Sequence, residues 1–414
     1  HEVMKKRRQL LIVFLILNIW FLCACQHKYT EHNTEDIAGL HWRWLIHPNE
    51  YEDLSFIDVN LIEVQRQDGR CGILNVQGEL VVPFEYDFIG KFYEGVALVK
   101  DGENFSYIDD SGSLVILGDF QEARGFSESM AAVQSDNKWG YINLSGEMII
   151  PYRYEECYPF SENFAAVKED GRWGFIDKEG KLVISNEYEE VRSFCEGFAA
   201  VKKNGKWYFI NNEGDVVTDS QYSEVRNFQE GYAAVTKDNK WGFINREGYL
   251  CIPCHYDDVG NFSEGKAAVK LENYADGLDE WAYINAKNEV VIDFYPYDAA
   301  EGRMIYVGEF QDGLAFVSKT LYCIIDEEGR NVFDGDSEFF ISSLCYNREY
   351  DVIPGYVYTD DMMTVKKYGL MGINGEQRLE PVFDYMDEVN GKYVVVSNLI
   401  NGEYKKGIIE LINE

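Results

Sequence analysis

Trp139-Gly140-Tyr141-Ile142-Asn143 decides the fold of this chain, because close copies of it recur at a constant distance. The copies are Trp173-Gly174-Phe175-Ile176-Asp177, Trp207-Tyr208-Phe209-Ile210-Asn211 and Trp241-Gly242-Phe243-Ile244-Asn245, each 34 residues after the one before. A fixed period of this length is typical of repeat proteins, in which each unit contacts mainly its neighbours. The chain is therefore built from tandem units of 34 residues.

The same frame extends in both directions when the Trp position is allowed to vary. Upstream it falls on Phe105 and Cys71, again 34 residues apart. Downstream it falls on Trp281, Tyr322, Met371 and Lys406, with steps of 40, 41, 49 and 35 residues. The sequence thus predicts about ten units, of which the last four are irregular.

One unit has the pattern of short β-strands joined by tight turns. Two apolar runs flank Asn204-Gly205, a dipeptide typical of a type I′ hairpin turn. A third apolar run follows in each unit and is ended by proline in several of them, as at Pro83 and Pro151. The connector to the next unit carries two aromatic residues six positions apart, such as Tyr154 and Phe160, which we expect in the seam between units.

These patterns predict an all-β fold of about ten tandem three-stranded β-hairpin repeats. Two helices per unit, as in tetratricopeptide repeats, are excluded because turn residues interrupt every candidate helix. We favour an open, twisted solenoid, with a closed propeller-like array as the alternative. Propellers usually have four to eight four-stranded blades, which fits ten unequal three-stranded units poorly.

The repeated motifs resemble those of the WG-repeat family of bacterial β-repeat proteins. The resemblance rests on Lys-Trp-Gly-Phe-Ile-Asn at 240–245, on Phe-x-Glu-Gly-x-Ala-Ala-Val at 228–235 and on Ile-Ile-Pro-x-x-Tyr at 149–154. It is specific over residues 61–270 and looser beyond them. The family implies repeat architecture and often secretion, and it implies no activity, catalytic residue or cofactor.

The amino-terminal segment has the composition of a secretion signal. Lys5-Lys6-Arg7-Arg8 precedes an apolar run from Leu10 to Leu22 that is too short for a membrane span. The run ends in Leu22-Cys23-Ala24-Cys25, which resembles the lipobox of bacterial lipoproteins, with Cys25 as the lipidated residue. A plain signal peptide or an uncleaved anchor are the alternatives. The predicted organisation is a signal peptide (1–24), a lipid-anchored tether (25–60), regular repeats (61–270) and degenerate repeats (271–414).

Charge limits the classes of partner. The formal net charge is −34, which repels the phosphate backbone of nucleic acids. We expect an extracytoplasmic monomer attached to a membrane by its amino-terminal lipid, with a protein or a cell-envelope polymer as its partner.

Several residue types suggest chemistry, but their positions favour structural roles. A glutamate recurs in six units, and a residue present in every unit is better explained by a turn or a backbone hydrogen bond than by catalysis. The recurring Trp residues are expected in the core, with a sugar-stacking platform as the alternative. Cys251 and Cys254 have zinc-site spacing, but they occupy ordinary strand positions and no second pair lies nearby. We therefore predict no catalytic residue, no metal and no cofactor.

Binding residues are expected where the repeat is interrupted, because loops on a rigid scaffold commonly carry recognition. Insertions occur at 271–280, between Tyr297 and Phe310, and between Asp334 and Met363. The candidate binding residues are Tyr274, Asp276, Asp279, Phe339, Phe340, Tyr346, Tyr350, Tyr356 and Tyr358. The predicted function is a non-enzymatic binding or interaction module. A glycan-active envelope enzyme and a structural spacer are the alternatives.

Overall fold

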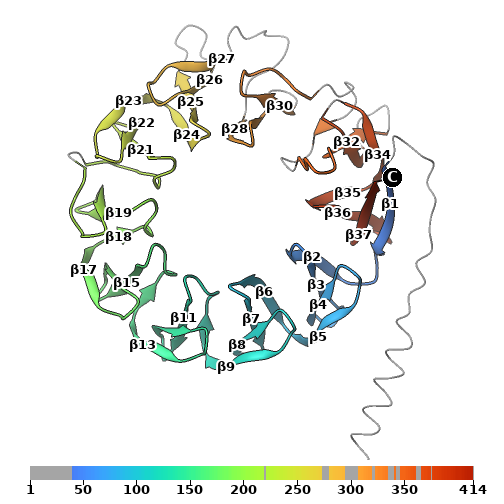
Figure 1. The fold of residues 1–414 in the computed structure, drawn as a ribbon, viewed down its shortest axis with the longest axis horizontal. Coiled ribbons are helices and arrows are strands. Elements are labelled where there is room, and N and C mark those ends of the chain that lie inside the picture. Colours follow the sequence, from blue (N-terminus) through green and yellow to red (C-terminus); the bar gives the residue numbers. More distant parts are fainter. Residues whose placement is uncertain are drawn as a thin grey trace, which may run out of the picture.

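The protein is a closed ring of small β-sheets. A computed structural model describes residues 40–218, 221–272, 279–293, 306–318, 322–333, 340–341, 346–359, 365–373 and 375–413. These residues form ten antiparallel sheets around a central opening, and every element in them is a strand (Figure 1). The all-β repeat prediction is confirmed. The closed array, which the sequence left as the alternative, is the arrangement found, and the favoured open solenoid was wrong.

Each sheet is called a blade and numbered in ring order. Blade 1 comprises β2 (Asp53–Asp58), β3 (Leu61–Gln65), β4 (Cys71–Asn75) and β5 (Leu80–Tyr86). Blade 2 comprises β6 (Phe88–Tyr93), β7 (Val96–Asp101), β8 (Asn104–Asp109) and β9 (Leu114–Phe120). Blade 3 comprises β10 (Glu122–Ala123), β11 (Met130–Ser135), β12 (Lys138–Asn143) and β13 (Met148–Tyr154). Blade 4 comprises β14 (Glu156–Cys157), β15 (Ala165–Glu169), β16 (Arg172–Ile176) and β17 (Leu182–Tyr188).

The later blades are less uniform. Blade 5 comprises β18 (Glu190–Val191), β19 (Phe198–Lys203) and β20 (Lys206–Asn211), and blade 6 comprises β21 (Tyr232–Lys237), β22 (Lys240–Asn245) and β23 (Leu250–Tyr256). Blade 7 comprises β24 (Asp258–Ser263), β25 (Lys266–Glu272), β26 (Asp279–Ile284) and β27 (Val290–Asp293). Blade 8 comprises β28 (Tyr306–Gln311), β29 (Leu314–Ser318) and β30 (Tyr322–Asp326). Blade 9 comprises β31 (Phe340–Ile341), β32 (Ile353–Tyr358), β33 (Lys366–Met371) and β34 (Gln377–Phe383).

Blade 10 closes the ring by combining the two ends of the described chain. Its strands are β35 (Tyr385–Asn390), β36 (Tyr393–Ile400) and β37 (Glu403–Asn413), with β1 (Leu40–Ile46) paired antiparallel to β37. The buried carboxylate of Glu410 on β37 pairs with Arg43 of β1 at 2.6 Å. Trp42 and Trp44 of β1 make edge contacts with the ring of Phe383, with centroids 5.4 and 5.8 Å apart.

The predicted tether therefore ends earlier than residue 60, because β1 and β2 already belong to the ring. The predicted signal peptide and Cys25 lie outside the described residues. Within those that are described, no helix is long and apolar enough to cross a membrane.

The predicted three-stranded unit also needs correction. In each four-stranded blade the first strand borders the central opening and the last lies on the outer rim (Figure 1). The first strand comes from the segment that the sequence analysis assigned to an irregular connector. The first strand is only two residues long in blades 3, 4, 5 and 9 and therefore leaves little periodicity in the sequence.

The Gly that follows the recurring Trp is required by close packing of the outer strand. A Cβ atom on Gly140 would lie 2.5 Å from the carbonyl oxygen of Ile150, where the pairing of β12 with β13 is irregular. In blade 5, Tyr208 takes this position, and the outer strand is reduced to isolated bridges such as Ile210 with Val216. The prediction that Met371 occupies the Trp position of its unit was wrong. In blade 9 the glycine that packs closely against the outer strand is Gly369, so the residue at the Trp position is Tyr368.

Aromatic side chains fill the seams between blades, as predicted. The rings of Tyr141 and Phe160, from blades 3 and 4, lie edge to face with centroids 5.0 Å apart. Equivalent contacts at 4.9–5.0 Å join Tyr107 to Phe126, Phe175 to Phe194, Phe209 to Phe228, Phe243 to Phe262 and Tyr283 to Phe310. Such pairs stabilise packing beyond the burial of their area.

Removal of β1 should open the ring. Deletion of residues 1–46 would expose the edge of β37 and lose the packing of Trp42, Trp44 and Ile46, for a cost of roughly 5 kcal/mol. Thermal unfolding of this variant is the measurement, and we expect a lower midpoint and aggregation. Deletion of residues 1–39 leaves β1 in place and is the matched control. Equal midpoints for the two deletions would show that β1 does not hold the ring closed.

Candidate functional site

The inner rim carries a row of turns that begin with glutamate. In blades 2 to 7 the turn before β7, β11, β15, β19, β21 or β25 starts with a Glu whose φ is between 51° and 54°. The next residue also has positive φ, as expected of type I′ turns. The glutamates are Glu94, Glu128, Glu162, Glu196, Glu230 and Glu264. A left-handed backbone is unfavourable for such a residue, so its side chain must compensate for the strain.

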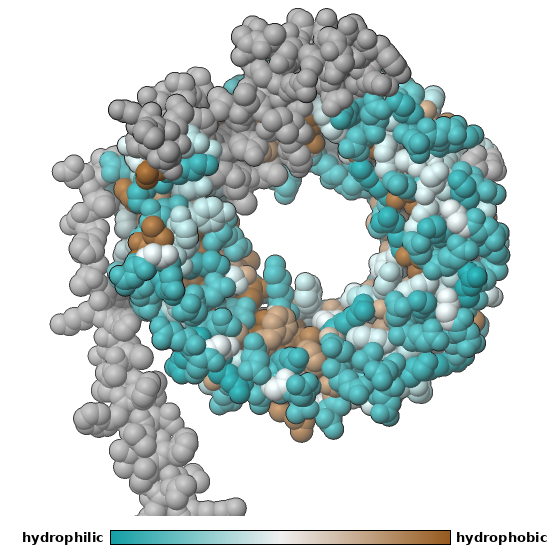
Figure 2. All heavy atoms as spheres, turned by 180° about the vertical axis from the view of Figure 1, so that it is seen from behind, coloured by the Kyte–Doolittle hydropathy of each residue, from teal (hydrophilic) through white to brown (hydrophobic). Residues whose placement is uncertain are grey.

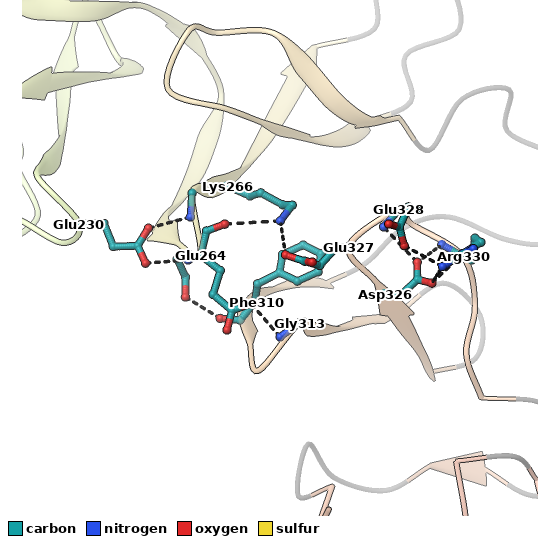
Figure 3. A network of polar contacts seen from close by, with 11 residues as sticks. Glu230, Glu264, Lys266, Phe310, Gly313, Asp326, Glu327, Glu328 and Arg330 are labelled. Carbon is teal, nitrogen blue, oxygen red and sulfur yellow. Dashed lines mark hydrogen bonds and ion pairs between the residues drawn. The ribbon is translucent and has the colours of Figure 1, made fainter.

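Each of these carboxylates accepts a hydrogen bond from the backbone of the turn in the next blade. Glu162 accepts from the amide of Gly197 at 2.7 Å, and Glu264 accepts from the amide of Gly313 at 2.8 Å. Glu230 accepts from two amides, those of Glu264 and Gly265 (Figure 3). The other rungs join Glu94 to Ser129, Glu128 to Asn163, and Glu196 to Glu230 and Gly231. We call this row the carboxylate ladder, and it confirms that the recurring Glu residues have a structural role.

A second row of hydrogen bonds runs beside the ladder. The residue before the Glu donates to the carbonyl oxygen of the buried Phe in the next blade. Ser127 donates to Phe160 and Ser161 donates to Phe194, both at 2.8 Å. Ser263 makes the same contact with Phe310, and Cys195 makes it through sulfur with Phe228. These junctions are thus fixed by polar contacts as well as by aromatic packing.

Both rows stop at the junction of blades 8 and 9. Asp312 stands where the ladder has Glu, and its side chain is shorter by one methylene group. Among the described residues, no hydrogen bond joins Asp312 to blade 9. Gly308 directly follows Val307, which pairs with Val317 of β29. In blades 3 to 6 the residue at the same register, directly after the residue that pairs with the corresponding Val, has a long side chain. Those long side chains are Arg124, Tyr158, Arg192 and Arg226.

The two shorter residues lie on a cleft between these blades. Its volume is about 710 Å³. One wall carries Glu309, Gln311 and Asp312, the other carries Tyr346, Asn347 and Arg348, and apolar side chains of Leu314, Phe316, Ile324 and Val389 also line it. We call it the blade 8–9 cleft.

The cleft presents opposite charges on its two walls. Arg348 is exposed and makes no ion pair within the described part of the chain, and Asp312 is likewise exposed. Glu309 is held in place by the side-chain amide of Asn261 at 2.9 Å. Asn347 donates to the carbonyl oxygen of Gly391 at 2.7 Å, and Tyr346 donates to Asp351 at 3.0 Å. These hydrogen bonds fix Glu309, Tyr346 and Asn347, while Asp312 and Arg348 are exposed.

The predicted binding residues fall only partly at this site. Tyr274, Asp276 and Phe339 lie outside the described residues. Asp279 begins β26 and Phe340 begins β31, so both belong to strands. Tyr346 lines the blade 8–9 cleft. Tyr350 packs against the core of blades 9 and 10.

Tyr356 and Tyr358 lie on β32 rather than in a loop. The ring of Tyr356 contacts that of Tyr368 at 5.3 Å, and the ammonium group of Lys366 lies 4.1 Å above it. The long insertion before Met363 thus supplies strands of blade 9.

The sequence analysis did not predict the cleft, because it placed the binding residues in the insertions. The useful signal was in-register substitution, namely Asp312 for Glu, since glycine stands at the register of Gly308 in blades 2 and 7 as well, as Gly90 and Gly260.

The Trp and Cys residues occupy structural positions, as predicted. Trp139, Trp173 and Trp207 are buried, and Trp241 is half-buried. The sulfur of Cys251 points to the carbonyl of Phe243, and that of Cys254 points to Val235 on a different strand. Burial raises the pKa of both thiols. A search confined to the described residues gives no group of His, Cys, Asp and Glu that could hold a metal ion.

Glu196 is a member of the ladder whose contacts favour the ionised carboxylate. Burial raises its pKa, but hydrogen bonds from Arg246 and from the amides of Gly231 and Glu230 outweigh burial, so its pKa lies below the ordinary 4.5. A carboxyl group with a lowered pKa in the folded state contributes stability above its unfolded pKa. That contribution is lost as the pH falls through the folded pKa.

We expect Glu196→Gln to weaken the ring at neutral pH and to reduce its sensitivity to acid. The variant should show a lower free energy of unfolding at pH 7, with a smaller loss between pH 7 and about pH 3 than the wild type. Urea unfolding at both pH values measures this. Glu103→Gln is the control, because Glu103 is exposed and makes no polar contact among the described residues. An undiminished acid sensitivity in Glu196→Gln would contradict the assignment.

Ten small antiparallel blades around an opening define a propeller-like ring assembled from repeats. Six consecutive segments match the WG containing repeat family. The matched residues are 72–105, 105–139, 139–173, 173–207, 209–241 and 241–274. The matches begin and end close to the recurring Trp position, so each spans parts of two blades.

A comparison with curated proteins gives no match. Among solved structures, a eukaryotic initiation factor is similar with a TM-score of 0.46 and 12% identity, covering 78% of this chain and 94% of that one. The computationally designed Ika8 protein has a TM-score of 0.35 and 12% identity, covering 67% and 93%. Hsv2p of Kluyveromyces lactis has a TM-score of 0.32 and 10% identity, covering 67% and 94%. These similarities are too remote to bear on function.

Proposed function

We propose that this protein is an extracytoplasmic, membrane-anchored lipoprotein whose ring is a non-enzymatic binding module for a protein or a cell-envelope polymer. The observation that carries the binding role is the blade 8–9 cleft. The carboxylate ladder joins six junctions of the ring and does not extend to this one, where a cleft has charged groups on both walls. A recess with charged walls on a rigid scaffold is well suited to recognition.

The chemistry of the cleft favours a ligand with both polar and apolar groups. Arg348 suits a carboxylate or a phosphate, and Asp312 suits a basic or hydrogen-bond-donating group on the opposite wall. The apolar lining, which includes the largely buried Phe316 and Ile324, suits an aliphatic or aromatic group. An exposed polypeptide segment or an envelope polymer with charged substituents offers this combination.

Filling the cleft should abolish ligand capture. Gly308→Arg introduces at this junction the side chain that blades 3, 5 and 6 carry in the same register, so the fold should be retained. We expect at least about a tenfold loss of affinity for the partner that the wild-type chain captures from envelope fractions. Gly90→Arg makes the same change in the equivalent position of blade 2, away from the cleft, and should bind normally. Undiminished binding by Gly308→Arg would remove the cleft from the function.

The anchoring role rests on the amino-terminal sequence. Cys25 follows a basic and apolar leader, and β1 begins only fifteen residues later, so a lipid on Cys25 would hold the ring close to the membrane surface. Acyl chains insert into the bilayer, and that attachment needs no spanning helix.

Replacing Cys25 should release the protein from membranes. Cys25→Ala removes the thiol that would carry the lipid, and we expect the variant to move from the membrane fraction to the soluble extracytoplasmic fraction. Cys23→Ala, two residues earlier, is the control and should stay membrane-bound. Metabolic labelling with a radioactive fatty acid should mark the wild type and Cys23→Ala only. Labelling of Cys25→Ala, or its retention in membranes, would contradict the proposal.

A further inference from the structure

The outer strand of each blade has one edge without a partner in its own blade. An unpaired strand edge exposes amide and carbonyl groups that can pair with another strand, and proteins commonly protect it with proline or charge. Three outer strands of this ring carry proline at one register, namely Pro83 on β5, Pro151 on β13 and Pro253 on β23. Each proline follows the residue that pairs with the third strand, such as Ile150 with Tyr141.

Other outer strands place a polar residue at this register. Ser185 follows Ile184 on β17, Asp293 follows Ile292 on β27, and Glu380 follows Leu379 on β34. His47 follows Ile46 at the end of β1. The described outer edges of these blades are therefore blunted by proline, by charge or by a polar side chain.

Strand β9 of blade 2 is different. Ile116 pairs with Tyr107, and the following residue is Leu117, whose side chain is 81% exposed. Leu114 and Val115 on the same strand are 50% and 43% exposed, and the strand carries no charge from Leu114 to Gly118. Hydrophobic atoms are visible on the outer rim where β9 lies (Figure 2).

The backbone at Leu117 is also available for pairing. Since three other blades accept proline at this register, the amide there is not needed to bond the third strand. It follows that the amide of Leu117 points away from blade 2. A free donor beside exposed aliphatic side chains is the arrangement that favours addition of a further strand.

We propose that β9 pairs antiparallel with β9 of a second copy of this protein, joining two rings through one continuous eight-stranded sheet. A two-fold axis brings the same edge to both partners, so an uncharged apolar strand meets an uncharged apolar strand. When Leu117 lies opposite Leu117 of the second copy, the only charged residue of the strand, Asp119, lies opposite Val115. Like charges are not brought together along the strand.

The strength of this dimer is limited by its size and by charge. One pair of short strands buries less than the roughly 1,200 Å² typical of stable complexes, so the association is weak and depends on concentration. Each ring also carries a net charge of −34, and the long-range repulsion between two rings is screened by salt. Association should therefore strengthen as salt is raised, which is the opposite of what an interface held by ion pairs would show. This inference does not depend on the cleft or on its ligand.

Sedimentation of the full chain in mild detergent tests the proposal. The wild type should form dimers whose dissociation constant falls as sodium chloride is raised from about 0.05 to about 0.5 M. Leu117→Pro introduces the residue that blades 1, 3 and 6 carry in this register, and Leu117→Lys adds the charge that protects natural edges. We expect each variant to weaken the dimer by at least about tenfold, with the unfolding temperature measured in parallel.

Leu80→Lys is the matched control, because Leu80 is 51% exposed on β5, an outer strand that already has Pro83. This variant should dimerise like the wild type. A wild type that stays monomeric up to millimolar concentration at both salt levels would overturn the proposal. So would dimers that persist in both Leu117 variants, or a monomeric chain whose β9 edge pairs only with a strand of another protein.

Discussion

The interaction on which the inner rim depends is the hydrogen bond from a turn amide of one blade to a glutamate carboxylate of the blade before it. It links two features that are unfavourable by themselves. A Glu with left-handed backbone geometry is strained, and turn amides at a crowded rim need acceptors. When the carboxylate of Glu162 reaches the amide of Gly197, both needs are met by one contact. Because hydrogen bonds to charged groups are stronger than neutral ones, the strained turn is retained in six blades.

Closure is the second constraint, and it acts on the chain as a whole. The ring closes where its last sheet is completed by the first described strand, since β1 lies beside β37. The contact is specific, since Gly407 lies against the carbonyl of Ile46 just as Gly140 lies against that of Ile150. The outermost strand of blade 10 therefore obeys the packing rule of the internal blades, although it comes from the other end of the chain.

Much of the repeat architecture could be predicted from the sequence, because the period is a local pattern. The hairpin at Asn204-Gly205, the seam contact of Phe160 and the structural role of the Glu row all follow from residues in register. Closure could not be predicted, because it depends on pairing between residues near 40 and near 410, which no periodicity reports. The short inner strands were missed for a related reason, since two residues such as Glu122 and Ala123 carry no alternation.

The candidate site could have been predicted from the sequence, but the prediction placed binding residues at other positions. The insertions were predicted to carry binding residues because they change the length of the unit. Part of the longest insertion is instead β32, a regular strand. The informative positions keep the length and change the residue: Asp312 on the inner side, and Leu117 on the outer edge. In a repeat protein, every position of one unit can be compared with the same position in the other units. A substitution is informative when the residues at that position in the other units have a known structural role that the substitution removes. Replacing a ladder Glu by Asp removes reach, and replacing an edge proline by Leu removes protection, so one blade gains a recess and another gains an open edge.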